Sequence, residues 1–250
     1  GRAVAAWIDE RVRSTDDAVP QAHVEAARLT PARAGAAKRI DTAPPVEDAA
    51  KLDDAWAPDL AARGGRVLLT WIDFHTYDWR AWSRSSSDGG RTWGPERAVT
   101  DAPAAREALD DAPRAALGPA GPLVAFTDHR APATIAPAAP YAAMAAVPGR
   151  ANHRVDVPSP LAVAPAVAPQ GGGFAVAWQD MAAGPGRILL TRVDRRGRPR
   201  GRRRIRVDDG GRAPWDAWRP ALAARPGGGL LAAWEDERDG PGNVFFAIGR

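Results

Sequence analysis

The chain contains no cysteine, which excludes disulfides, cysteine metal sites and thiol nucleophiles. No apolar run approaches the roughly 18 residues of a transmembrane helix, so we expect no membrane span. No charged segment followed by an apolar one marks a signal peptide. Only Lys38 and Lys51 are lysines among 34 basic residues, so arginine carries almost all the positive charge. The hydrophobic share of 45% still allows a sizeable core in the 250 residues.

A short pattern recurs five times along the chain: an apolar run, then Trp or Phe, any residue, and Asp. Its aromatic residues are Trp7, Trp71, Phe126, Trp178 and Trp234, which lie 64, 55, 52 and 56 residues apart. A period of about 50 residues with several strands in each copy is typical of β-propellers.

Three further strands are expected around each Trp-x-Asp strand. An apolar segment containing proline and a Gly-rich turn precede it, and we expect each proline to begin its strand, where a missing N–H does least damage. Two more apolar or alternating segments follow it. Four antiparallel strands in each repeat predict one propeller blade. The preceding segments are 56–61, 112–117, 164–168 and 218–223, and the last strands are 38–41, 96–100, 153–156 and 204–208.

The predicted fold is therefore all-β, a single β-propeller domain over residues 1–250 with four-stranded antiparallel blades. The repeats cover roughly 1–45, 54–101, 110–157, 161–209 and 216–250. The first repeat begins at its second strand and the last stops after its third. Because these ends do not complement one another, we expect an excerpt of a ring with six or more blades; a five-bladed ring with one ragged blade is the alternative. A short helical turn is expected at most near residues 46–52.

Residues 86–93 form a complete Ser-x-Asp-x-Gly-x-Thr-Trp motif, known as an Asp-box. Asp88 can accept backbone N–H bonds across a tight hairpin, and Gly90 can supply a positive φ. Thr92 can bond back into the turn, Trp93 can fill the space between neighbouring sheets, and Ser86 opens the motif. The motif therefore predicts a hairpin staple. A degraded copy at residues 193–197 keeps its Asp and Gly.

With the repeat period, this motif makes the chain resemble the sialidase-like, bacterial-neuraminidase-repeat β-propellers. The resemblance implies an extracellular or periplasmic protein that recognises glycans, and a sialidase-type exo-glycosidase. It also implies an arginine triad, a Tyr nucleophile paired with Glu, and an Asp acid/base. The chain has no Phe/Tyr-Arg-x-Pro motif, and neither Tyr77 nor Tyr141 matches the nucleophile's context. No catalytic residue is therefore assigned from the sequence.

The loops after the Trp-x-Asp strands supply the candidate ligand-binding residues. Their acidic and guanidinium groups could converge near the ring axis. In the alternative interpretation, each Asp caps a turn and each Arg pairs with it, which the recurrence in every repeat favours. The candidates are Asp9, Arg11, Asp73, His75, Tyr77, Trp79, Asp128, Arg130, Asp180, Asp236 and Arg238.

Two local features have both a functional and a structural interpretation. The second repeat concentrates Phe74, His75, Tyr77, Trp79 and Trp82, which could stack on sugar rings or plug the space between blades. Residues 192–206 contain nine arginines, a possible polyanion surface. No aromatic residue interleaves with them, so a solvated edge strand is favoured and nucleic acid is not an expected partner.

The sequence indicates no cofactor and no metal site. The four histidines, His23, His75, His129 and His153, fall in different repeats, and no acidic loop matches a calcium motif. The leading hypothesis is a glycan-recognising, sialidase-like propeller with glycosidase activity and a glycan or glycoconjugate partner. The alternative is a non-catalytic propeller that acts as an adhesion or protein-interaction module.

Overall fold

In the part of the chain that the computed structural model describes, all regular elements are β-strands, arranged in five antiparallel sheets. The structure describes residues 3–10, 22–41, 55–74, 79–101, 110–129, 141–156, 159, 161–182, 184–201, 204–208, 216–240 and 242–249. Within these ranges no helix is long and apolar enough to span a bilayer. The helical turn expected near residues 46–52 lies outside them.

Each sheet uses strands that follow one another in sequence. The first contains β1 (Ala3–Asp9), β2 (His23–Leu29) and β3 (Lys38–Arg39); the second contains β4 (Ala55–Arg63), β5 (Arg66–Asp73), β6 (Arg80–Ser86) and β7 (Arg97–Ala98). The third contains β8 (Asp110–Gly118), β9 (Gly121–Asp128), β10 (Ala142–Ala146) and β11 (His153–Arg154). The fourth contains β12 (Ala162–Gln170), β13 (Gly173–Asp180), β14 (Arg187–Val193) and β15 (Ile205–Arg206); the fifth contains β16 (Ala217–Ala224), β17 (Leu230–Asp236) and β18 (Asn243–Gly249).

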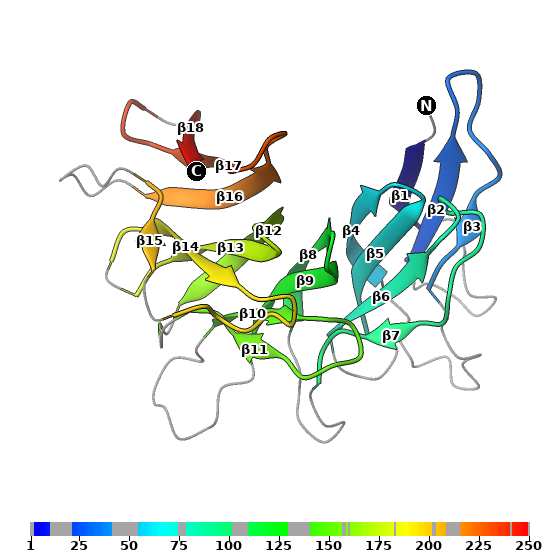
Figure 1. The fold of residues 1–250 in the computed structure, drawn as a ribbon, viewed down its shortest axis with the longest axis horizontal. Coiled ribbons are helices and arrows are strands. Elements are labelled where there is room, and N and C mark those ends of the chain that lie inside the picture. The colour runs from blue at the N-terminus through cyan, green and yellow to red at the C-terminus, as the bar shows by residue number, and fades with distance from the viewer. Residues whose placement is uncertain are drawn as a thin grey trace.

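The five sheets follow one another around an arc (Figure 1). The strands β4, β8, β12 and β16 contact one another in succession and form its inner wall. The first and last sheets stand at the two ends of the arc, and each lacks one strand of the four-stranded pattern. The all-β propeller architecture is confirmed. The assignment of the sheets to one domain, and to an excerpt of a larger ring, stays a prediction.

The repeated aromatic residue packs each sheet onto the one before it. Trp71 of the second sheet lies in a cluster with Val24 and Ile40 of the first, and Trp178 of the fourth lies with Val155 of the third. Trp71, Phe126 and Trp178 are fully buried. Because an aromatic side chain removes a large apolar area from water, this one position supplies much of the contact between neighbouring sheets.

In two of the sheets, the short outer strand is followed by a buried aspartate that accepts a hydrogen bond from the backbone of the neighbouring strand. Asp41 accepts a 2.8 Å hydrogen bond from the backbone N–H of Val24, and Asp208 accepts the matching bond from Ile188. Arg39 donates to Asp41, as Arg206 does to Asp208, from two residues earlier. Burial alone would raise the pKa of Asp41, but the bonds from His23 and Arg39 outweigh it and lower that pKa.

The expectation that each proline begins its strand is wrong for the inner strands β4, β8, β12 and β16. The prolines lie inside these strands, at β-bulges. The strands begin one or two residues before the predicted segments, so each proline is the fourth residue of its strand. A bulge tolerates proline because it leaves a residue outside the ladder of hydrogen bonds. The residue before each proline has a positive φ of 48–50°, which a sequence pattern alone does not reveal. These residues are Ala57, Ala112, Ala164 and Arg219.

The Asp-box forms the predicted staple at the turn after β6. One carboxylate oxygen of Asp88 accepts hydrogen bonds from the backbone N–H groups of Arg91 and Thr92, at 2.9 and 3.0 Å. The other accepts from the Thr92 hydroxyl at 2.7 Å. Ser86 Oγ donates to Asp88 and accepts from the Gly90 N–H. Gly90 has φ of 81°.

The degraded copy in the fourth sheet keeps part of this geometry. Asp194 accepts hydrogen bonds from the backbone N–H groups of Arg196 and Arg198, at 2.8 and 3.0 Å, and Gly197 has φ of 86°. Both hairpins lie on the preceding sheet: Gly90 lies against Val4, and Gly197 against Ala145. The motif therefore stabilises the contact between sheets as well as its own turn.

The Asp-box makes stability depend on pH. Hydrogen bonds from the Thr92 backbone and hydroxyl hold the pKa of Asp88 far below its usual value. A lowered pKa stabilises the fold fully above the unfolded-state value of about 3.9, and this stabilisation is lost as pH falls below it. We expect Asp88→Asn to lower the urea midpoint at pH 7 and to differ less from wild type at pH 3. An unchanged difference would contradict this role, and Glu237→Gln is the exposed control.

Candidate functional site

The inner strands of four sheets surround a cavity of about 540 Å³ near the centre of the arc. A second cavity of about 310 Å³ continues it and shares Ala115, Val167 and Leu222 with the first. The walls are mostly alanine and proline, and the charged lining residues of the larger cavity are Asp59, Arg114 and Arg219. A concave site with mostly apolar walls and a few polar groups is typical of small-ligand binding.

Asp59 and the two arginines differ in how they are held. The Asp59 carboxylate accepts a 2.6 Å hydrogen bond from the Ala115 backbone N–H, which ties the second sheet to the third. Arg219 lies 3.4 Å from Glu235 in an exposed pair. Arg114 is exposed at the cavity wall. The guanidinium groups can therefore reach a ligand, whereas Asp59 has a structural bond already.

One end of the third sheet gathers the richest set of reactive side chains. Asp111 lies near the start of β8, Asp128 ends β9, His129 follows it, and Tyr141 precedes β10. The His129 and Tyr141 rings meet edge to face with centroids 4.0 Å apart. Asp111 is exposed and lies next to Ala112, which lines the larger cavity. We name Asp111, Asp128, His129 and Tyr141 the third-sheet cluster.

Burial makes His129 an uncharged group in this cluster. Its burial lowers the pKa, and the negative charges of Asp111 and Asp128 offset only part of that effect. The imidazole is therefore neutral at pH 7 and keeps one nitrogen that can accept a proton or a hydrogen bond. Together with the exposed Asp111 carboxylate, it gives the cluster the groups needed for proton transfer.

The other Trp-x-Asp aspartates lie in separate sheets and hold their own tryptophans. The indole Nε1 of Trp71 donates to Asp73 at 3.3 Å, and that of Trp234 donates to Asp236 at 3.2 Å. The same pair in the fourth sheet, Trp178 and Asp180, is 3.5 Å apart. Each carboxylate thus orients the aromatic residue that packs against the preceding sheet. Asp73, Asp180 and Asp236 end β5, β13 and β17, one in each of three sheets.

The structure also describes candidate residues in the first and fifth sheets, at the two ends of the arc. Arg238 donates to Asp236 and lowers the pKa of that carboxyl, and its guanidinium lies 4.4 Å above the Phe245 ring. Asp9 is buried at the end of β1. The remaining candidates, Arg11, His75, Tyr77 and Arg130, lie outside the described residues.

No protein-family model and no curated protein sequence matches the chain. Solved structures do. The GH93 α-L-arabinofuranosidase of Fusarium graminearum, in complex with arabinobiose, aligns with a TM-score of 0.56 at 13% identity, over 99% of this chain and 76% of its own. The chain folds like the propeller glycoside hydrolases. The leech intramolecular trans-sialidase aligns over 99% of this chain and 42% of its own, with a TM-score of 0.55 at 12% identity.

A thermostable family-43 glycoside hydrolase has the same architecture. It aligns over 90% of this chain and 81% of its own chain, with a TM-score of 0.50 and 11% identity. At such low identities, the likeness establishes the fold and transfers no catalytic residue. The similarity in fold therefore covers an α-L-arabinofuranosidase and a family-43 glycoside hydrolase as well as a trans-sialidase.

The two tryptophans of the second repeat's aromatic segment, Trp79 and Trp82, pack against the hydrophobic clusters between neighbouring sheets. Trp79 contacts the hydrophobic cluster between the second and third sheets, and its ring lies 5.0 Å from that of Phe74. Trp82 packs on the other face, against the cluster shared with the first sheet. The described members of the expected sugar-stacking surface therefore also fill the space between sheets, and sugar binding by Trp79 stays a prediction.

The arginine-rich hairpin lies at the outer edge of the fourth sheet. Arg195, Arg196, Arg198 and Arg200 are exposed around the turn that Asp194 staples. Within the described parts of the chain, no three His, Asp or Glu side chains gather as metal ligands.

Sequence reasoning identified part of this site. Asp128 was a candidate, and His129 follows it in the same loop, but Asp111 and Arg114 were not singled out. The sequence feature that could have pointed to them is the pair Asp110-Asp111, which precedes Ala112-Pro113 at the start of an inner strand. The bulge there, between Asp111 and Arg114, changes which face each residue takes, and this cannot be read from the pattern.

Proposed function

We propose that the chain binds a carbohydrate at the larger cavity, which the inner strands line, and hydrolyses a glycosidic bond there. The observation that carries the proposal is the third-sheet cluster, in which the exposed Asp111 adjoins Ala112 of the cavity wall and influences the charge of His129, whose ring contacts Tyr141. The glycoside hydrolase fold supports it. The sialidase-type specificity and the extracellular or periplasmic location belong to the same proposal, and rest on the resemblance.

The chemistry of the cluster fits a sugar substrate. Asp111 is the exposed carboxylate that can donate or accept a proton at a glycosidic oxygen, as glycoside hydrolysis requires. His129 can accept a hydrogen bond from a sugar hydroxyl, because its imidazole is neutral. Arg114, at the cavity wall, can hold a carboxylate or hydroxyl group of the ligand through its guanidinium.

A non-catalytic carbohydrate-binding module is the second candidate. It is favoured by the indole bonds to Asp73, Asp180 and Asp236, which give these carboxylates a structural role. Glycoside hydrolysis generally needs two groups that flank the bond. If the cluster supplies only one of them, the propeller would bind its ligand without cleaving it.

Binding and hydrolysis should be measured separately, with arabinobiose and 3′-sialyllactose as probes. Arabinobiose is the ligand named for the similar arabinofuranosidase structure, and 3′-sialyllactose is the compound soaked into the trans-sialidase. We expect calorimetry to give a Kd below about 1 mM for at least one probe, and chromatography to show release of its terminal sugar. Arg114→Ala should weaken binding, whereas Arg195→Ala on the outer hairpin should not. Binding without release would favour the module, and no binding would contradict both candidates.

A further inference from the structure

The hairpin after β14 concentrates arginine at one end of the fourth sheet. The backbone N–H of Arg200 donates to the Arg192 carbonyl at 2.8 Å, and the N–H of Asp194 donates to the Arg198 carbonyl at 2.8 Å. Residues 192–200 therefore form an ordered two-stranded ribbon, which we call the arginine hairpin. Its exposed arginines are Arg192, Arg195, Arg196, Arg198 and Arg200.

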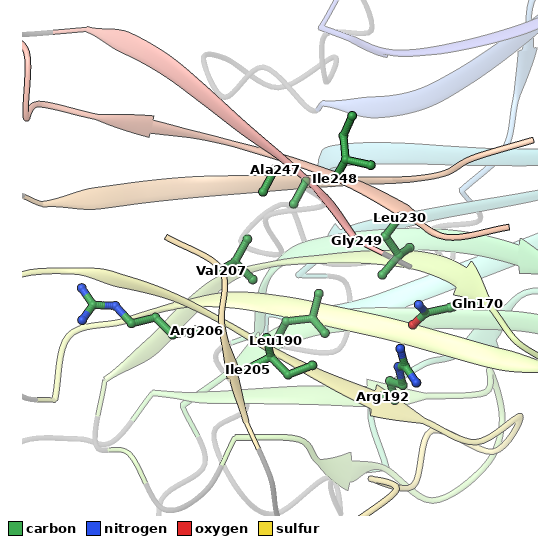
Figure 2. A pocket seen from close by; sticks show the side chains of 11 residues that line it. Gln170, Leu190, Arg192, Ile205, Arg206, Val207, Leu230, Ala247, Ile248 and Gly249 are labelled. Atoms are coloured by element: carbon green, nitrogen blue, oxygen red, sulfur yellow. The ribbon is translucent and has the colours of Figure 1, made fainter. Parts of the chain in front are cut away.

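The two sides of this ribbon differ in chemistry. Val193 pairs with Pro199, and Val193 is buried in the cluster between the third and fourth sheets. Because side chains alternate along a strand, Arg192 and Arg200 lie on the other side of the ribbon, directly opposite each other. Figure 2 shows Arg192 among the residues that line a groove of about 190 Å³ between the fourth and fifth sheets, while Arg206 points away from it.

The pairing of Arg192 with Arg200 has an electrostatic cost. Like charges directly opposite each other on two paired strands destabilise a hairpin. The carboxylate of this hairpin, Asp194, accepts backbone N–H bonds from Arg196 and Arg198 at 2.8 and 3.0 Å. Its single negative charge offsets one of the five positive charges. An oxyanion between the guanidinium groups would remove the repulsion that is left.

Arginines of two neighbouring sheets extend this positive surface. Gly197, at the hairpin tip, lies against Ala145 of β10, next to the turn that leads to β11. That turn carries the exposed Arg150. A Cβ at Gly149 of the same turn would lie 3.5 Å from Nη1 of Arg97, which is exposed on β7. We call Arg97, Arg150 and the arginine hairpin together the arginine rim.

The described carboxylates next to the rim do not neutralise it. Glu96 lies 3.9 Å from Nε of Arg84, and Asp101 accepts a 2.8 Å hydrogen bond from the Asn152 N–H. Together with Asp194, these groups are fewer than the arginines of the rim. The outer strands of the second, third and fourth sheets therefore present a surface with an excess of positive charge.

The rim and the third-sheet cluster lie at opposite ends of the third sheet. At one end of β10, Ala142 pairs with Asp128 of the cluster. At the other end, Ala146 pairs with Val124 and is followed by the turn that carries Arg150. A molecule held at the rim would therefore occupy a different surface from a ligand of the cavity.

The side chains of the rim favour one class of polyanion. Guanidinium groups bind oxyanions through paired N–H donors. Proteins that bind single-stranded nucleic acid also stack aromatic side chains on the bases. The large exposed aromatic side chains that the structure describes, Trp56 and Phe246, lie on β4 and β18 instead. A sulfate ester offers terminal oxygens in three directions, which suits arginines that come from three sheets.

We propose that the arginine rim binds a sulfated polysaccharide. Its sulfate groups would bridge Arg192 and Arg200, and the polymer would continue along the rim to Arg150 and Arg97. The positive surface is independent of the cavity. The choice of a glycan among polyanions rests on the proposed function, which makes the chain a carbohydrate-binding protein.

Dextran sulfate and dextran test the proposal, because they share a backbone and differ in their sulfate groups. We expect fluorescent dextran sulfate to bind the 250-residue chain with a Kd below about 10 μM in polarisation titrations at about 0.15 M NaCl. Dextran should not bind. The affinity for dextran sulfate should fall steeply as NaCl is added, because binding releases counterions from the polymer.

Two triple variants with the same loss of charge locate the binding. Both replace exposed arginines, so both should keep the circular dichroism spectrum of the wild type. The rim variant should bind dextran sulfate at least about tenfold more weakly and with a smaller salt dependence, whereas the control variant should bind within about twofold of wild type. The rim variant is Arg195→Gln, Arg196→Gln and Arg198→Gln, and the control variant is Arg33→Gln, Arg66→Gln and Arg225→Gln.

Three outcomes would overturn the proposal. The first is the absence of saturable binding to dextran sulfate. The second is an equal loss of affinity in the two triple variants, which would mean that net charge alone attracts the polymer. The third is tighter binding to an oligothymidylate of about 30 nucleotides than to dextran sulfate, which would make the partner a nucleic acid.

The same titrations separate this inference from the proposed function. Arg114→Ala, at the cavity wall, should bind dextran sulfate like wild type, although it should bind the sugar probes more weakly. Sugar binding without dextran sulfate binding would overturn the inference about the rim alone. Dextran sulfate binding without sugar binding would overturn the proposed function alone.

Discussion

Trp178→Ala is expected to lower the free energy of unfolding by about 3–5 kcal/mol. The side chain is fully buried between the third and fourth sheets, where it packs in a cluster with Val155 and Phe174. Its removal leaves a cavity and also leaves Asp180 without its indole donor. Because a domain is stabilised by about 5–15 kcal/mol in total, urea unfolding followed by circular dichroism should show a large shift in midpoint.

Trp56→Ala is the control for this prediction. Trp56 is 46% exposed on an inner strand, so its loss should change the free energy of unfolding by less than about 1 kcal/mol. Equal effects of the two substitutions would mean that the repeated aromatic residue does not hold the sheets together. The comparison tests the repeated Trp-x-Asp pattern as the main packing element of the fold.

Asp111→Asn is expected to reduce the rate of glycoside hydrolysis by about 10²–10⁴-fold, if the proposed activity is correct. The amide keeps the size of the side chain and removes the group that exchanges protons. Asp111 is exposed, so the thermal midpoint should change little. Steady-state measurements on the probe that the wild type cleaves would separate a fall in kcat from a change in KM.

Asp239→Asn removes another exposed carboxylate, from the connection between β17 and β18, and should leave the rate unchanged. The pH profile gives an independent test, because burial holds the pKa of His129 below its ordinary 6.5. A role for the neutral imidazole predicts a constant rate at neutral pH and a fall as the pH drops through this lowered pKa. His129→Gln should abolish that fall. A profile that is the same in the variant would rule out His129 as the titrating group.

The sheets could be predicted from the sequence because their signals are local and repeated. Trp or Phe at near-regular spacing marks one strand of every sheet, and the Asp-box fixes a hairpin through bonds within eight residues. The bulges could not be predicted in the same way. A positive φ at Ala57 or Ala112 is imposed by the neighbouring strand, since alanine has no preference for it.

The third-sheet cluster was only partly predictable for a different reason. Asp111 and Tyr141 lie 30 residues apart and reach the same end of the sheet because β8, β9 and β10 pair in register there. Burial of His129 then shifts its pKa, and burial is a property of the packed sheets. The other aspartates share the motif of Asp128, yet the indole bonds give them a structural role.

The packing of each sheet on the one before it has a consequence for how the chain unfolds. Such an array behaves as a linear series of units coupled to their nearest neighbours, so cooperativity depends on each interface in turn. The fifth sheet has an apolar outer face, with Val244, Phe246 and Ile248 between 58% and 71% exposed. The side chains of β13 are almost all buried, so hydrogen exchange should be faster in β18 than in β13.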